Sequence, residues 1–158
     1  MNYKNHISKS FENLLKHIGA LGSCEFFLIV IIFFVLIGEI KISLILWIGF
    51  ILMYLIAIPL RIIFFKPRPN PKKYSNIIEK IKVSSFPSMH SARSSFLGVV
   101  LIYYMNYAIG ISIFIVSLIL IIMYSRIYNK KHYYTDLIGG FAIAVVVWVA
   151  IYSLLYII

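Results

Sequence analysis

Acidic residues and cysteine are scarce in this chain of 158 residues, which has 5 Asp and Glu against 15 Lys and Arg, and one cysteine, Cys24. A single cysteine excludes an internal disulfide framework. The formal net charge of +10 favours an anionic partner, which is a membrane surface, an anionic substrate or nucleic acid. Nucleic acid is disfavoured because no soluble basic domain is visible to bind it.

Charged residues of either sign are also few, at 13% of the chain, whereas 62% is hydrophobic. A soluble domain of this length does not bury that much apolar surface, so the composition indicates an integral membrane protein. The length suits one domain over residues 1–158. The N-terminus lacks a small-residue cleavage site, which predicts no cleavable signal peptide.

Long uncharged runs predict about five transmembrane helices, at residues 18–38, 42–60, 88–107, 111–125 and 137–158. The first contains Glu25, which we expect near one end of the span or facing the bundle. Residues 1–17 repeat apolar side chains at helical spacing among lysines, which suits an amphipathic helix on the membrane surface, with a frayed terminus as an equal alternative. The expected fold is therefore an all-α, multi-pass helix bundle with an N-terminal amphipathic helix.

The stretch from Ser94 to Ser125 has no charged residue and suits either one overlong helix or a hairpin of two. Met105–Gly110 is the natural break between two helices. A hairpin places the polar loops 61–94 and 126–136 on the same side of the membrane, whereas one long helix separates them. The residues with candidate chemistry lie in these two loops, and this favours the hairpin.

The first polar loop contains Arg61 and Arg68, seven residues apart, with Pro69 stiffening the backbone after the second. The planar, permanently charged guanidinium is suited to bidentate recognition of phosphate. The alternative is that both arginines cap a span and touch lipid headgroups, as interfacial cations commonly do.

Later in the same loop, Pro87 is well placed in the first turn of a helix. The amides of Ser88, Met89 and His90 would then form an anion site at the helix N-terminus, with the Ser88 hydroxyl as a further donor. His90 would lie beside that anion and could act as an acid. The alternative is a serine N-cap followed by an interfacial histidine.

In the second polar loop, His132 and Asp136 are four residues apart and would share one face of a helix. A nearby carboxylate fixes the imidazole tautomer and leaves the other ring nitrogen free as a nucleophile. Arg126 adds a third guanidinium. A His/Asp pair at this spacing is common, so the pair alone indicates little.

Taken in order, the three segments resemble the signature of the type 2 phosphatidic acid phosphatase superfamily, which reads Lys-x6-Arg-Pro, Pro-Ser-Gly-His and Ser-Arg-x5-His-x3-Asp. This chain has Arg61-x6-Arg68-Pro69, Pro87-Ser88-Met89-His90 and Ser125-Arg126-x5-His132-x3-Asp136. The resemblance covers residues 61–136, about half of the chain. Arg61 replaces the usual Lys and Met89 the usual Gly, which affects phosphate geometry and removes no reacting group.

The resemblance implies that His132 attacks phosphorus and forms a phosphohistidine, that Asp136 orients His132, and that His90 protonates the leaving oxygen. It implies that the phosphoryl oxygens are held by Arg61, Arg68, Arg126, Ser88 and the backbone at Met89. It implies no cofactor and no metal, and no carboxylate cluster suited to Mg²⁺ is visible in the sequence.

The implied activity is metal-independent hydrolysis of a lipid phosphate or pyrophosphate in the cell membrane, with phosphatidate, phosphatidylglycerol phosphate and polyprenyl pyrophosphate as candidates. A lipid phosphotransferase and a non-catalytic lipid-phosphate binder or transporter are alternatives. A vanadate-dependent haloperoxidase shares the site pattern, but that class is soluble. The family's site usually faces away from the cytoplasm, whereas the cationic loops favour the cytoplasmic side, so both orientations stay open.

Overall fold

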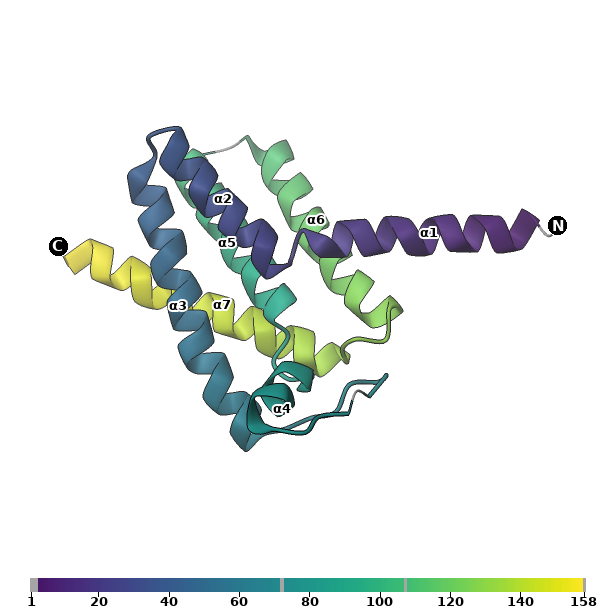
Figure 1. The fold of residues 1–158 in the computed structure, drawn as a ribbon. Helices are drawn as coiled ribbons and strands as arrows, with labels where there is room; N and C mark the ends of the chain where they lie inside the picture. Colours follow the sequence, from purple (N-terminus) through teal and green to yellow (C-terminus); the bar gives the residue numbers. More distant parts are fainter. Residues whose placement is uncertain (1–2, 72, 107, 158) are drawn as a thin grey trace.

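The computed structural model describes residues 3–71, 73–106 and 108–157, and over these residues the chain forms seven helices and no strand (Figure 1). This confirms the all-α fold. The helices are α1 (Tyr3–Ala20), α2 (Cys24–Leu36), α3 (Ile40–Ile63), α4 (Ile77–Val83), α5 (Met89–Met105), α6 (Ile109–Tyr128) and α7 (Tyr134–Ile157).

Three of the described helices, α3, α6 and α7, are long and apolar enough to cross a membrane, and α1 with α2 makes a fourth span if that bent pair is counted as one. The three coincide with the expected spans at 42–60, 111–125 and 137–158, of which residue 158 lies outside the described residues. The expected count of five is not reached by length and composition, because α5 has 17 residues and α2 has 13.

The expectation of one continuous helix over residues 18–38 is wrong. The chain turns after Ala20, and α2 departs from the direction of α1 by 49°. The turn has a local cause, because the Ser23 hydroxyl accepts a hydrogen bond from the Phe26 amide at 3.1 Å and so caps a new helix. The short apolar helix α2 therefore begins at Cys24, with Glu25 in its first turn.

Helix α1 extends away from the bundle toward the N-terminus (Figure 1). Its last turns pack on α6, where Leu15 is buried and the Phe11 ring meets the edge of the Tyr128 ring at 5.6 Å between centroids. Leu14 stays exposed. A helix therefore forms in the N-terminal region, with residues 1–2 outside the described part of the chain, and its location on the membrane surface stays a prediction.

The hairpin expected near Met105–Gly110 is confirmed, and the alternative of one long helix is wrong. Asn106 ends α5 with φ of 44°, a left-handed conformation that Asn tolerates better than most residues. Helices α5 and α6 then pack against each other. The start of α5, the end of α6 and the start of α7 therefore lie at one end of the bundle (Figure 1).

Helix α5 is the centre of the bundle and contacts α2, α3, α6 and α7. Its side chains Ala92, Phe96 and Val100 are fully buried in the shared core. Close approach depends on glycine in α7: a Cβ atom at Gly140 would lie 2.2 Å from the Ser88 carbonyl oxygen. Small residues let backbones approach in this way, and the contact fixes the start of α5 against α7.

Candidate active site

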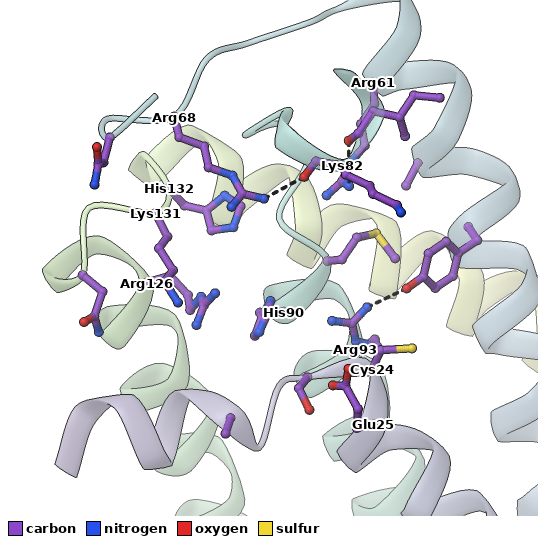
Figure 2. Close-up of a pocket in the computed structure, with 18 of the residues that line it drawn as sticks. Cys24, Glu25, Arg61, Arg68, Lys82, His90, Arg93, Arg126, Lys131 and His132 are labelled. Carbon is purple, nitrogen blue, oxygen red and sulfur yellow. Dashed lines mark hydrogen bonds between the residues drawn. The ribbon is translucent and has the colours of Figure 1, made fainter. Parts of the chain in front are cut away.

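A cavity of about 730 Å³ lies where the two polar loops meet α1, α3 and α5. Figure 2 shows the cationic side chains arranged around an open centre, with His90 between Arg126 and Arg93. Glu25 is the single carboxylate among the lining residues, and the eight cations are Lys16, Arg61, Arg68, Lys82, Arg93, Arg126, Lys130 and Lys131. Such an excess of one charge in a concave site concentrates anions.

The structure brings six of the eight predicted site residues to this cavity from five different parts of the chain. They are Arg61 of α3, Arg68 of the following loop, Met89 and His90 of α5, Arg126 of α6, and His132 of the turn before α7. The other two, Ser88 and Asp136, are completely buried and lie outside the cavity lining.

Two of the arginines are held by backbone carbonyl groups. Arg61 donates to the carbonyl oxygens of Ile81 at 3.2 Å and Pro87 at 2.9 Å. Arg68 donates to the carbonyl oxygen of Lys82 at 2.9 Å. Burial lowers the pKa of Arg68, but a guanidinium keeps its charge because its pKa starts so high. The loop that joins α3 to α5 is therefore folded around fixed positive charges.

The same arginines also have donors that the described part of the chain leaves unsatisfied. The Nε atoms of Arg61, Arg68 and Arg126 are buried and make no hydrogen bond there. A buried donor without a partner is costly, and nearly all such groups in proteins are paired. Together with the excess of cations, three unsatisfied guanidinium donors beside one cavity suit it to an anionic ligand.

His132 lies in the turn between α6 and α7, two residues before α7 begins, and not on the helix as its spacing from Asp136 suggested. Its Nδ1 is 2.8 Å from the Ser85 carbonyl oxygen and 3.7 Å from Asp136 Oδ2. Because a carbonyl oxygen only accepts, we assign the ring proton to Nδ1 and the lone pair to Nε2. The Ser85 carbonyl thus makes the direct hydrogen bond that we expected from Asp136.

The electrostatics of the site keep His132 neutral. Its pKa falls from the usual 6.5 to about 4, chiefly because the ring is buried, and further because Arg126 and Arg68 are close. Asp136 and the Ser85 carbonyl act in the opposite direction and only partly offset this. At neutral pH the imidazole therefore has a free lone pair, which a nucleophile requires.

Asp136 is the third residue of α7, and its buried carboxylate is surrounded by donors. Oδ2 accepts from the Tyr133 amide at 2.8 Å and from the Ser85 hydroxyl. Oδ1 accepts from Lys66 Nζ at 2.7 Å and from the Thr135 hydroxyl at 3.5 Å. The contact with Tyr133 is one half of a capping box, and an acidic group in the first turn is favoured by the helix dipole.

Ser88 is the N-cap of α5, as the simpler interpretation of its sequence had it. Its hydroxyl accepts from the Ser91 amide at 3.4 Å, and its own amide donates to the Asp136 carbonyl at 2.9 Å. The hydroxyl expected to donate to phosphate is therefore turned into the helix. Met89 and His90 follow as the first two residues of α5, where backbone amides have no partner within the helix.

Three residues with no role in our sequence interpretation lie at this site. Ser85 and Lys66 surround Asp136, and each stands two residues before a motif residue, Pro87 and Arg68 respectively. Arg93 lies one helical turn after His90 and lines the cavity. Their position beside motif residues was the available signal in the sequence. Their hydrogen-bond partners lie far away in the sequence, so the contacts themselves could not be predicted.

Arg93 joins the cavity to the turn between α1 and α2. It donates to the Gly22 carbonyl oxygen through Nε at 3.2 Å and Nη2 at 3.0 Å, and to the Tyr54 hydroxyl through Nη1 at 3.0 Å. The break in the expected first span thus has a structural role, because it presents the Gly22 carbonyl group to a buried guanidinium.

The fold and the cavity define an α-helical bundle of the membrane type with histidines in a cationic cavity at one end. The sequence profile of the PAP2 superfamily matches residues 42–157, and the chain belongs to this superfamily. The fold is similar to the crystal structure of LpxE from Aquifex aeolicus, with a TM-score of 0.72 and 21% identity over 89% of this chain and 84% of that chain. No curated protein sequence matches the chain.

Proposed function

We propose that this protein hydrolyses a phosphate monoester or pyrophosphate of a lipid, with His132 as the nucleophile. One observation carries the proposal: a neutral histidine lines a cavity in which three arginines have unsatisfied donors. Membership of the PAP2 superfamily supports it. Phosphoryl transfer mainly requires positioning and stabilisation of charge, which this arrangement suits.

In the first step, the Nε2 lone pair of His132 attacks phosphorus and the bond from phosphorus to the leaving oxygen breaks. Arg68 and Arg126 hold the non-bridging oxygens, with Arg61 and the amide of Met89 beside them. The ring gains positive charge as it attacks, and the carboxylate of Asp136, 3.7 Å away, stabilises that charge. The product of this step is a phosphohistidine.

His90 completes both steps by moving one proton. Burial and the nearby Arg126 and Arg93 lower the pKa of His90 in the free protein. The negative charge of the bound phosphoryl group acts against this and favours the protonated form of His90, which then protonates the leaving oxygen. Neutral His90 next accepts a proton from water as that water attacks the phosphohistidine. Phosphate leaves, and both histidines return to their starting states.

The cavity also suits the hydrocarbon part of a lipid. Tyr54, Ala57 and Ile58 of α3 contribute apolar surface to its lining. The phosphate headgroup of the lipid would lie among the cations, while its hydrocarbon chain would extend along α3 into the bilayer of the cell membrane. Polyprenyl pyrophosphate and phosphatidate are our preferred substrates, and phosphatidylglycerol phosphate is a further candidate.

The proposal is tested by measuring phosphate release from these lipids by purified protein in detergent with EDTA present. We expect wild-type protein to release phosphate and His132→Ala to lose the activity by about 10³-fold or more, because the nucleophile is gone. His17→Ala is the matched control, since His17 is exposed on α1 and lies outside the cavity lining. Full activity of His132→Ala, or no release by the wild type from any of the lipids, would contradict the proposal.

A further inference from the structure

Lys66, in the loop after α3, binds the buried carboxylate of Asp136. Its Nζ atom is 2.7 Å from Asp136 Oδ1 and 2.7 Å from the Thr135 hydroxyl, and it lies 4.4 Å from the centre of the Tyr133 ring. Its carbonyl oxygen accepts from the Ser85 amide at 2.7 Å. Lys66 therefore contacts the surroundings of the His132–Asp136 pair, although it does not line the cavity.

The geometry divides the Asp136 carboxylate into two sides. Oδ1 faces Lys66, whose side chain is 35% exposed, while the side chain of Asp136 is 0% exposed. Oδ2 faces the Ser85 hydroxyl and lies 3.7 Å from His132 Nδ1. A buried carboxylate without a cationic partner is costly, so the charge of Lys66 stabilises the ionised form of Asp136.

The charge of Lys66 also affects the protonation of His132. A carboxylate whose charge is not balanced, at this distance, would favour the imidazolium form of the ring. An imidazolium has a proton on both nitrogens and no lone pair with which to attack phosphorus. With Lys66 on the far side of Asp136, the pair can remain ionised carboxylate and neutral imidazole until a substrate binds.

We propose that Lys66 is a positioning residue of the site, which holds Asp136 ionised and balances part of its charge, and so adds to the burial and the arginines that keep His132 neutral before it attacks. The inference rests on the proposed function, in which His132 is the nucleophile. Lys66 forms no bond to the substrate and transfers no proton. It lies between Arg61 and Arg68, inside the spacer of the first motif, where the motif specifies no residue.

The test compares Lys66→Met, which keeps the length of the side chain and removes its charge, with Lys66→Arg, which keeps the charge. Lys80→Met is the matched control, because Lys80 lies in the same polar segment with its Nζ 5.3 Å from the Phe65 ring centre and outside the cavity lining. The kcat/KM of phosphate release is measured from about pH 4 to about pH 8. The substrate ionises identically in all experiments, so differences between the pH profiles of the variants arise from the protein.

In Lys66→Met we expect the acidic limb of kcat/KM to move to higher pH by about one unit or more, the size of effect that a neighbouring charge exerts. The direction follows from the charges, because a proton on either His132 or Asp136 is bound more tightly once the cation is removed. The loss is expected in kcat more than in KM, since Lys66 is outside the cavity. Lys66→Arg and Lys80→Met should follow the wild-type profile.

A second measurement separates this inference from the proposed function. The four histidines are labelled with ¹⁵N, His132 is assigned with a His132→Asn variant, and its ring is titrated by NMR without substrate. Lys66→Met should raise the midpoint of that titration. An unchanged midpoint would overturn the role of Lys66, even if Lys66→Met is inactive. If Lys66→Met does not fold, Lys66→Gln is titrated in its place, and the same two outcomes apply.

Discussion

The two sides of His132 have opposite character. On the cavity side, Arg68 and Arg126 have buried Nε donors that nothing in the described part of the chain satisfies. On the other side, the Asp136 carboxylate accepts hydrogen bonds from Lys66, the Ser85 hydroxyl and the Tyr133 amide. In the proposed reaction, the unsatisfied donors bind the phosphoryl group, whereas the satisfied groups set the protonation state of His132.

The largest effect that separates the two sides is expected from Arg126→Ala. Loss of one preorganised donor to a developing charge typically lowers the rate by about 10²–10³-fold. Thermal stability should be unchanged or higher, because removing one cation relieves repulsion among the cations of the cavity. Arg126→Lys should recover only part of the activity, since lysine keeps the charge without the planar fork.

The measurements for Arg126 are kcat/KM with a lipid phosphate and the midpoint of thermal unfolding, both in the same detergent. If Arg126→Ala kept activity within about threefold of the wild type, the cavity side would not bind the phosphoryl group as described. A large fall in the midpoint of thermal unfolding would contradict the stability prediction, because it would mean that Arg126 supports the fold.

The smallest effect on activity is expected from Ser88→Ala, on the side of His132 where the polar groups have partners. The Ser88 hydroxyl caps α5 and lies outside the cavity lining. Replacing an N-cap serine with alanine costs about 1 kcal/mol of stability, and we expect the activity of folded protein to fall less than about threefold, below the loss seen for a catalytic donor. Denaturant unfolding measures the change in stability and kcat/KM measures the change in activity. Ser117→Ala, on the exposed face of α6, is the control. A loss of about 10²-fold in kcat/KM would place the hydroxyl on the phosphate.

Much of the cavity side could be predicted from the sequence. The motif spacings identified Arg61, Arg68, Arg126, His90 and His132, and the break near Met105 predicted that their loops meet. Their placement around one cavity could be predicted because few residue types suit a phosphate site, and because a charge-free stretch too long for one span must turn. Their roles in binding and catalysis stay predictions.

The satisfied side could not be predicted in the same way. The group that fixes the His132 tautomer is the backbone carbonyl of Ser85, which every residue has, so no residue type signals it. The spacing of His132 and Asp136 suggested one helix, but Asp136 binds the Tyr133 amide and α7 starts after His132. Hydropathy likewise predicted a continuous first span, while the local cap at Ser23 begins a new helix.

The measurement that tests the central claim most directly is the stereochemical course at phosphorus. A lipid thiophosphate made chiral with oxygen isotopes is hydrolysed in isotopically labelled water, and the configuration of the released thiophosphate is determined. Each in-line displacement inverts phosphorus, so attack by His132 followed by attack by water should give net retention. Net inversion would mean a single attack by water, and it would contradict His132 as the nucleophile.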